Sequence, residues 1–188
     1  LPPHTYAIRV HGVELGRGEA PVGCVLAIGD NINDLPGTHT REPVFGLPAT
    51  WVPVEFKQQA EMSGATVVDR SSVITTHMAE IVRRNAGRLL SRADVKALLE
   101  MVRMTDPVVA DEINAAQLGL GDVQCVLQAL LDESVPIRDL IRICEVLSER
   151  GRTTKDVETL TEAVRGVLGP AISASYALDG TLPVITLD

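Results

Sequence analysis

Residues 66–90 constrain the fold most, because the chain changes character on either side of them. They open with a β-type run at 66–68, turn through residues 69–71, and continue as a helical pattern. Ser71 or Ser72 can accept the first free N–H groups of that helix. The apolar face of the helix is formed by Val73, Ile74, His77, Met78, Ile81, Val82 and Leu89. Since the preceding sequence is typical of strands and loops, and the following sequence of helices, the stretch predicts a joint between two subdomains.

Two strands are predicted before this joint. Residues 6–15 alternate apolar and polar side chains and are interpreted as one strand, bulged or turned at Gly12. Residues 21–28 are interpreted as a second strand that pairs with the first in a hairpin. The Gly16-x-Gly18 segment is predicted to be the turn, because it lacks the third glycine of a dinucleotide fingerprint. Since an isolated hairpin is only marginally stable, residues 66–68 and the following helix are expected to complete this sheet.

Residues 29–65 are predicted to form a loop-rich subdomain inserted into the β-rich one, because proline, glycine and asparagine recur there at close intervals. One short helix is expected near its end, terminated by Gly64. Phe45 lies among these turns beside Glu42 and allows two interpretations. It anchors a small core of the insert, or it forms an apolar surface that receives a hydrophobic side chain of a partner.

Residues 91–176 are predicted to be helical. Ser91-x-x-Asp94 resembles a capping box, and Asp106 followed by Pro107 is typical of a second helix start. Gly169-Pro170 is expected to kink or restart the last helix. Residues 182–187 are apolar on both faces, which predicts a strand that has no partner inside this chain. The predicted class is α+β: a split small α/β subdomain with an inserted loop-rich subdomain, then an all-α helical subdomain, truncated at both ends.

Charge and composition exclude some functions. The formal charge of −8 over 188 residues disfavours sequence-independent binding to phosphate backbones. No run approaches the roughly 20 apolar residues of a membrane helix, so the chain is expected to be soluble. The three cysteines are far apart and without CxxC spacing, which predicts reduced thiols, with Cys125 and Cys144 in helical cores.

The sequence predicts no enzyme. No serine or cysteine nucleophile shares a recognisable motif with His77, which is interpreted as a core histidine bonded to the backbone. No paired carboxylates suited to hydrolysis stand out, and no cofactor or metal motif is present. A helical nucleic-acid-binding module is a competing hypothesis, because short helices with tight turns imitate a helix-turn-helix. The acidic balance and the lack of a basic recognition helix count against it.

Several ordered blocks carry a family resemblance: Y-A-I-R-V-H-G-V-E-L-G-R-G-E, E-P-V-F-G-L-P-A-T-W-V, G-A-T-V-V-D-R-S-S-V-I-T-T-H-M-A-E-I-V-R and V-Q-C-V-L-Q-A-L-L-D-E-S-V-P-I-R-D-L. With T-K-D-V-E-T-L-T-E-A-V-R-G-V-L-G and V-I-T-L-D, nearly the whole chain resembles the cytoplasmic domain of the FlhA/InvA/LcrD (FHIPEP) family. These are export-gate proteins of type III secretion. The flagellar branch is favoured over the injectisome branch. Pro170 and the segment A-G-R-L-L-S-R-A-D depart from the family pattern.

The resemblance implies a subdomain organisation, an oligomeric state and a cellular location. Residues 1–28 with 66–90 match the first of four subdomains, residues 29–65 the inserted second and residues 91–176 the helical third. Residues 177–188 match a linker and the first strand of an incomplete fourth. The family's cytoplasmic part forms a nine-membered ring at the bacterial inner membrane, with the membrane reached only through an N-terminal domain that is absent here.

The resemblance also implies a function without catalysis or cofactors. The family's cytoplasmic domain docks export chaperone–substrate complexes, orders their export and works with other components of the export apparatus. The docking site of the family is a hydrophobic dimple between the first two subdomains. Its acidic, Phe and Thr positions match Glu42, Phe45 and Thr76 here, and Val68 and Val73 match residues that line the same hollow.

Overall fold

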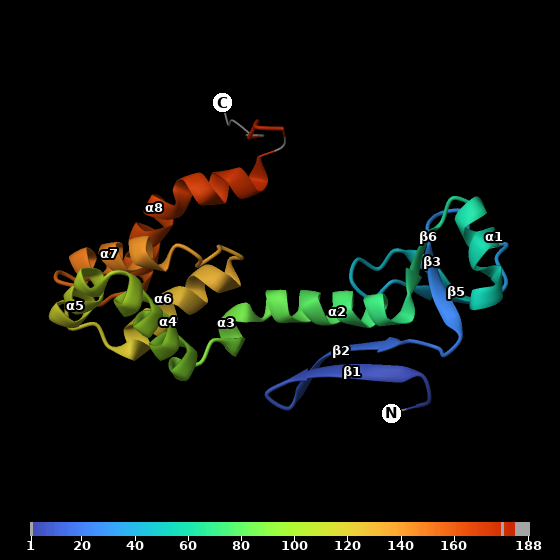
Figure 1. Ribbon diagram of the computed structural model, residues 1–188, viewed down its shortest axis with the longest axis horizontal. Helices are drawn as coiled ribbons and strands as arrows, with labels where there is room; N and C mark the ends of the chain where they lie inside the picture. The colour runs from blue at the N-terminus through green and yellow to red at the C-terminus, as the bar shows by residue number, and fades with distance from the viewer. Residues whose placement is uncertain (1, 178, 183–188) are drawn as a thin grey trace. The chain divides into compact units, whose positions relative to one another are not determined.

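The computed structural model describes residues 2–177 and 179–182, which form two compact units (Figure 1). The boundary between Leu1–Arg84 and Asn85–Asp188 falls inside the stretch 66–90. The first unit contains strands β1–β6 and the helices η1, α1 and α2, and the second is built from the helices α3–α8. The predicted α+β class is therefore confirmed.

The chain begins with a two-stranded antiparallel hairpin of β1 (Thr5–Val10) and β2 (Val13–Glu19). Its two-residue turn has positive φ at both positions, 49° at His11 and 80° at Gly12, which is the geometry of a type I′ hairpin turn. The predicted turn at Gly12 is therefore confirmed, whereas the predicted pairing of residues 6–15 with residues 21–28 is wrong. The chain reverses at Gly12, and the predicted turn at residues 16–19 is part of β2.

The second sheet has four antiparallel strands in the order β4-β5-β3-β6. The strand β6 pairs with β3, so the expected third strand is confirmed. The inserted segment supplies two strands of this sheet as well as loops, which the sequence analysis missed. A 3₁₀ turn η1 and the short helix α1 follow, and Gly64 ends them at φ 85°. The bounds are β3 (Cys24–Ile28), β4 (Thr38–Arg41), β5 (Pro48–Pro53), β6 (Thr66–Asp69), η1 (Val54–Phe56) and α1 (Lys57–Met62).

Both faces of β3 are buried, because successive side chains of a strand point to opposite faces. Val25 and Ala27 belong to one apolar cluster with Val52 of β5 and Ala60 of α1. Leu26 belongs to a second cluster on the other face, with Ala20, Ala49, Trp51 and Val73. The two cores of the first unit therefore lie on opposite faces of one sheet, and β5 contributes to both of them as β3 does, through Val52 on one face and Trp51 on the other.

The helix α2 (Arg70–Arg84) follows β6 directly. Its free N-terminal amides are accepted by Asp69, whose Oδ1 lies 2.9 Å from the nitrogen of Ser71 and 3.0 Å from that of Ser72. The cap is thus Asp69 and neither of the predicted serines. The buried face repeats every four residues at Val73, His77 and Ile81. The helix ends at Arg84, and α3 (Ala86–Leu89) is a separate turn, so the predicted continuous helix is interrupted at Asn85.

The second unit packs its helices around one apolar core that includes Val126, Leu130, Ile143, Leu147 and Leu160. The predicted capping box at Ser91 is confirmed, as is the N-cap at Asp106. The last helix continues through Pro170, so the predicted restart does not occur. The bounds are α4 (Arg92–Thr105), α5 (Pro107–Ala115), α6 (Leu120–Asp132), α7 (Leu140–Arg150) and α8 (Val157–Tyr176).

Three further sequence predictions concern the second unit or the end of the chain. Cys144 is buried in the helical core as expected, and burial raises the pKa of its thiol to about 11. Cys125 is exposed, so its prediction as a core residue is wrong. The predicted strand 182–187 lies outside the described residues except for Leu182. Among the helices that the structure describes, none has the length and apolarity needed to cross a bilayer.

Candidate functional site

The loop that joins β4 to β5, residues 42–47, is an ordered hairpin connection that we call the Phe45 loop. The N–H of Glu42 donates to the carbonyl of Leu47 at 2.9 Å, and the N–H of Gly46 donates to the carbonyl of Glu42 at 2.9 Å. Gly46 adopts φ 69°, a conformation that glycine reaches without a Cβ penalty. The guanidinium of Arg41 also donates to the Gly46 carbonyl at 2.7 Å. The backbone of the loop is therefore closed by hydrogen bonds at both ends.

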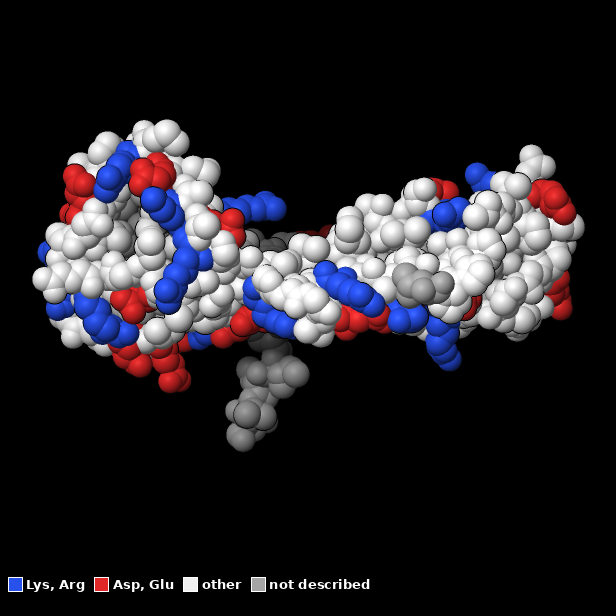
Figure 2. All heavy atoms as spheres, turned by 90° about the horizontal axis from the view of Figure 1, so that it is seen from below, with Lys and Arg blue, Asp and Glu red and all other residues white. Residues whose placement is uncertain are grey.

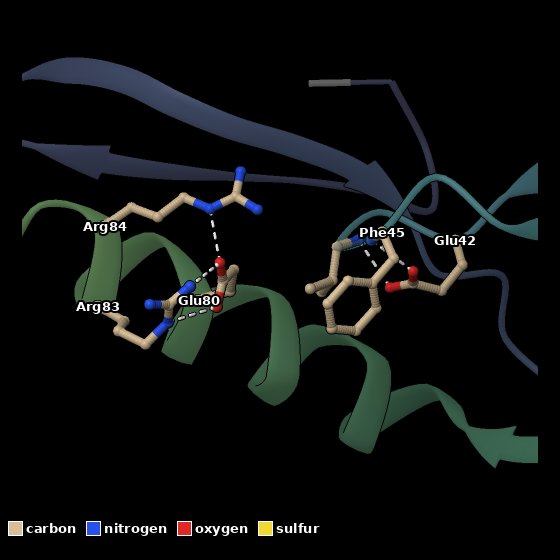
Figure 3. A network of polar contacts seen from close by, with 6 residues as sticks. Glu42, Phe45, Glu80, Arg83 and Arg84 are labelled. Atoms are coloured by element: carbon tan, nitrogen blue, oxygen red, sulfur yellow. Dashed lines mark hydrogen bonds and ion pairs between the residues drawn. The ribbon is translucent and has the colours of Figure 1, made fainter. Parts of the chain in front are cut away.

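The carboxylate of Glu42 braces this loop from the inside. Its Oε1 lies 2.7 Å from the nitrogen of Val44, and its Oε2 lies 2.7 Å from the nitrogen of Phe45 (Figure 3). Glu42 is only 8% exposed, and a buried carboxylate is tolerated when charge-assisted hydrogen bonds replace its water. Both oxygens of Glu42 are thus used by the backbone of its own loop.

Phe45 lies at the tip of the loop and is 75% exposed. The interpretation of Phe45 as an anchor of the insert's core is therefore wrong. Figure 3 shows its ring projecting from the turn that Glu42 holds. When a partner covers an exposed aromatic ring on an ordered backbone, the burial of the ring stabilises the complex. The side chain loses little conformational freedom on binding.

A hollow of about 480 Å³ adjoins the loop. One wall is β2, from Gly16 to Glu19, and another is the end of β4 together with Glu42 and Pro43. Leu26, Trp51 and His77 also line it. Each of these three is buried, so the hollow is shaped by core side chains of the first unit.

His77 is fixed in this hollow by Tyr6. The phenol oxygen of Tyr6 lies 2.8 Å from Nδ1 of His77, and the two rings meet edge to face with centroids 5.7 Å apart. Burial lowers the pKa of His77, against the opposing effect of the Glu42 charge. Burial, with a contribution from Glu42, raises the pKa of Tyr6. His77 is a core histidine as predicted, although its partner is a side chain and not the backbone.

Two glycines of β2 make room for this pair. A Cβ at Gly18 would lie 2.5 Å from the Tyr6 oxygen, and a Cβ at Gly16 would lie 2.9 Å from Nε2 of His77. Residues two apart in a strand share a face, so both glycines face the same packed pair. This close approach explains the Gly-x-Gly segment that the sequence analysis interpreted as a turn.

The other predicted site residues occupy two different environments. Val68 and Val73 pack in the apolar cluster that contains Leu26 and Trp51, where Val73 is buried and Val68 partly buried. Thr76 is exposed on α2, directly before His77. Among the described residues, no hydrogen bond joins Thr76 to Glu42 or Phe45. The structure therefore links Glu42 and Phe45 by a hydrogen bond and places Val68 and Val73 in one apolar cluster.

Residues of the site that the sequence analysis missed are Tyr6, Trp51 and the two glycines of β2. The signal was present as glycines at alternating positions, a pattern that inside a strand typically marks a close approach of another group. The wrong placement of the turn concealed this signal, because glycines in a turn are explained by backbone conformation and need no packing partner.

Further along α2, Glu80 is paired with two arginines of its own helix (Figure 3). Its carboxylate lies 2.7 Å from Nη2 of Arg83 and 2.5 Å from Nε of Arg84. Hydrogen bonds from Arg83 and then Arg84 lower the pKa of Glu80 to about 2. Both arginines thus share one carboxylate, which offsets one of their two positive charges.

Acidic and basic side chains are interspersed over both units on the face shown in Figure 2. This mixed pattern differs from the continuous basic surface that nucleic-acid-binding domains present. Within residues 2–177 and 179–182, no group of three His, Cys, Asp or Glu side chains is placed to hold a metal ion.

Comparison with known proteins places the chain in a family. The model of the FHIPEP family matches residues 1–188. The flagellar biosynthesis protein FlhA of Caulobacter vibrioides is 42% identical over 97% of this chain, and FlhA of Bacillus subtilis is 38% identical over 99%. The matches cover 26% and 28% of those proteins, so the chain spans about a quarter of their length.

Solved structures agree with the sequence relatives. The CdsV protein of Chlamydia pneumoniae matches with a TM-score of 0.81 and 28% identity, over 96% of this chain and 52% of that one. CdsV in complex with CdsO matches with a TM-score of 0.80 and 28% identity, over 94% of this chain and 55% of that one. The nonameric SctV-C of EPEC shares the fold at a TM-score of 0.69 and 22% identity, over 95% of this chain and 55% of that one. The chain belongs to the FHIPEP family.

Proposed function

We propose that this chain is part of the cytoplasmic portion of a flagellar type III protein export gate. In that role it docks export chaperone–substrate complexes and so contributes to the order in which substrates leave. The family match and the FlhA relatives at 42% and 38% identity support the flagellar branch. An injectisome export gate is the alternative, because CdsV matches over nearly the whole chain.

The observation that carries the docking proposal is the exposed ring of Phe45 on an ordered loop. The ring is 75% exposed, and the backbone amide of the same residue is fixed by Glu42. A partner that covers the ring removes apolar surface from water on both sides. Because the loop is already ordered, little backbone entropy is lost when the partner binds.

Replacing Phe45 with alanine tests the proposal. Phe45→Ala is expected to weaken the binding of a purified flagellar chaperone–substrate complex by about 2 kcal/mol or more, measured by calorimetry or surface binding. The melting temperature is expected to stay close to the parent's, because the ring contributes no core packing.

Met62→Ala is a matched control, because Met62 is an 89% exposed apolar side chain at the end of α1 in the same unit. It should leave the affinity unchanged. A Phe45→Ala protein that binds as tightly as the parent would show that the Phe45 loop is not the docking site. A shift of DNA mobility by the chain at low salt would instead favour the nucleic-acid-binding hypothesis.

A further inference from the structure

We infer that Glu42 is a positioning residue of the docking site and that its charge does not itself contact the partner. The inference rests on the proposed docking function of the Phe45 loop. An acidic residue beside an exposed aromatic ring would ordinarily be expected to steer a charged partner. The structure gives Glu42 a different task, which follows from where its two carboxylate oxygens point.

Both oxygens of the Glu42 carboxylate already have hydrogen-bond donors. Each oxygen of the Glu42 carboxylate accepts one backbone N–H at 2.7 Å, from Val44 and from Phe45. At 8% exposure, the carboxylate presents little surface to an incoming molecule. A partner could use this charge only by displacing the hydrogen bonds that order the loop, and those charge-assisted bonds are among the stronger ones in proteins.

The Glu42 carboxylate also orients the backbone that leads into Phe45. The two donors are the consecutive backbone amides of Val44 and Phe45, so the carboxylate fixes the backbone on the N-terminal side of Phe45 and with it the direction of the Cα–Cβ bond that carries the ring. The other hydrogen bonds described for the loop, Glu42 to Leu47, Gly46 to Glu42 and Arg41 to Gly46, close its ends and do not reach these two amides. Without the carboxylate, the segment 43–45 would keep its ends in place and lose its orientation.

The chain itself shows which substitution should preserve the brace. Asp69 accepts the amides two and three residues ahead through one oxygen, at 2.9 and 3.0 Å. Asp106 does the same with Val108 and Val109, at 3.1 and 3.3 Å. The spacing equals that between Glu42 and its two donors. An aspartate at position 42 can therefore hold both amides, whereas a glutamine offers one acceptor and turns an NH₂ group toward the other donor.

Glu19 supplies a matched control for charge. It lines the same hollow and is exposed on β2. No hydrogen bond or ion pair of its carboxylate occurs within the described part of the chain. Glu19→Gln removes one negative charge near the Phe45 loop. It leaves every hydrogen bond of the loop in place, because Glu19 makes no bond to the loop.

The experiment measures the free chain and its complex separately. In the free chain, amide hydrogen exchange by NMR should be about tenfold or more faster at Val44 and Phe45 in Glu42→Gln than in the parent. Glu42→Asp should keep the parent's protection at both amides. Exchange elsewhere in the four-stranded sheet should be unchanged in both variants, which shows that the chain is folded.

Binding of a purified flagellar chaperone–substrate complex provides the second readout. Glu42→Gln should raise the Kd about tenfold, and Glu42→Asp should restore the parent's value. The ratio of variant to parent should be the same at low and at high salt, because no exposed charge has been lost. Glu19→Gln should bind as the parent does at high salt.

Two outcomes would overturn the inference. In one, Glu42→Gln weakens binding while Val44 and Phe45 keep their exchange protection. In the other, the loss of binding in Glu42→Gln fades at high salt and matches that of Glu19→Gln. Failure of the docking proposal looks different, because Phe45→Ala would then bind normally, while the exchange measurements on the free chain would still report on the brace.

Discussion

The phenol oxygen of Tyr6 lies 2.8 Å from Nδ1 of His77, so a side chain of the first strand is joined to the middle of α2. The bond spans 71 positions of sequence and connects the hairpin to the helix that covers the second sheet. It also places a titratable ring in the wall of the hollow beside the Phe45 loop.

Acidification is expected to destabilise the chain through His77. Burial lowers the pKa of His77 in the folded chain below the ordinary value of about 6.5. The unfolded chain therefore binds the proton more readily, and the contribution of His77 to the unfolding free energy is present above that value and is lost as the pH falls toward the lowered pKa. His77→Gln should unfold with a smaller dependence on pH between 7 and about 5. An NMR titration of the His77 ring should show a depressed pKa, and a raised one would contradict the argument.

Gly18→Ala should destabilise the first unit by about 1–3 kcal/mol, because its Cβ would lie 2.5 Å from the Tyr6 oxygen. Gly166→Ala is the control. Gly166 is an exposed glycine of α8 with no atom within 4 Å of the added Cβ. It should stabilise the chain by up to about 1 kcal/mol, since alanine is the better helix former. Denaturant unfolding measures both changes, and equal effects would refute the packing argument.

The start of α4 offers a separate test in the helical unit. The Ser91 hydroxyl accepts the N–H of Asp94 at 3.2 Å, and the Asp94 carboxylate accepts the N–H of Ser91 at 2.9 Å. Ser91→Ala should cost about 1 kcal/mol of unfolding free energy, and Ser91→Thr should cost less because it keeps the hydroxyl. If both variants unfold like the parent, the capping box contributes nothing.

Glu80 should remain ionised well below the pH at which other glutamates are protonated. Its pKa is lowered to about 2 by hydrogen bonds from Arg83 and Arg84. Any stabilisation by these pairs is present above the ordinary pKa of glutamate and is lost as the pH falls through the lowered one. Carbon-detected NMR gives the titration of the carboxyl directly. Replacing both arginines with glutamine should return the midpoint toward the ordinary range, and high salt should weaken the shift.

The 188-residue chain is expected to be monomeric at tens of micromolar, on the order of the concentrations at which weak self-association is tested. It covers about half of the chain that forms the nonameric SctV-C. Light scattering should therefore give a mass near the 20.2 kDa of one chain. A discrete, closed assembly of several copies would show that the surfaces described here are sufficient for ring formation.

Sequence reasoning succeeded where local chemistry decides the structure. The capping box at Ser91, the N-cap at Asp106 and the helix end at Gly64 each depend on residues within a few positions. It failed where distant residues decide. Gly16 and Gly18 were assigned to a turn, because their reason for being glycine is a pair of rings supplied by Tyr6 and His77. The strands β4 and β5 were missed for a related reason. Their short, proline-flanked sequences form strands because distant segments are available to pair with them: β5 pairs with β3, and β4 pairs with β5.

Of the predicted site residues, the structure brings together a part, and their roles depend on contacts that the sequence does not show. The resemblance named Glu42 and Phe45, and the structure brings these two together. The sequence could not show that the carboxylate lies inside the loop, because a glutamate before a proline is equally compatible with a solvent-facing side chain. Nor could it decide the exposure of Phe45, since exposure depends on how the neighbouring strands fold back.

The double burial of β3 also bears on how relatives of this chain can be recombined. Val25 and Ala27 serve one core and Leu26 the other, and the strands on both sides of β3 come from different parts of the sequence. The inserted segment supplies Ile32, Leu35, Val52 and Ala60 to the first of these cores, and Val25 and Ala27 of β3 complete it. A chimera that exchanges residues 29–65 between relatives would have to match the exchanged side chains to a resident β3, so β3 should be exchanged together with the insert if the first unit is to fold.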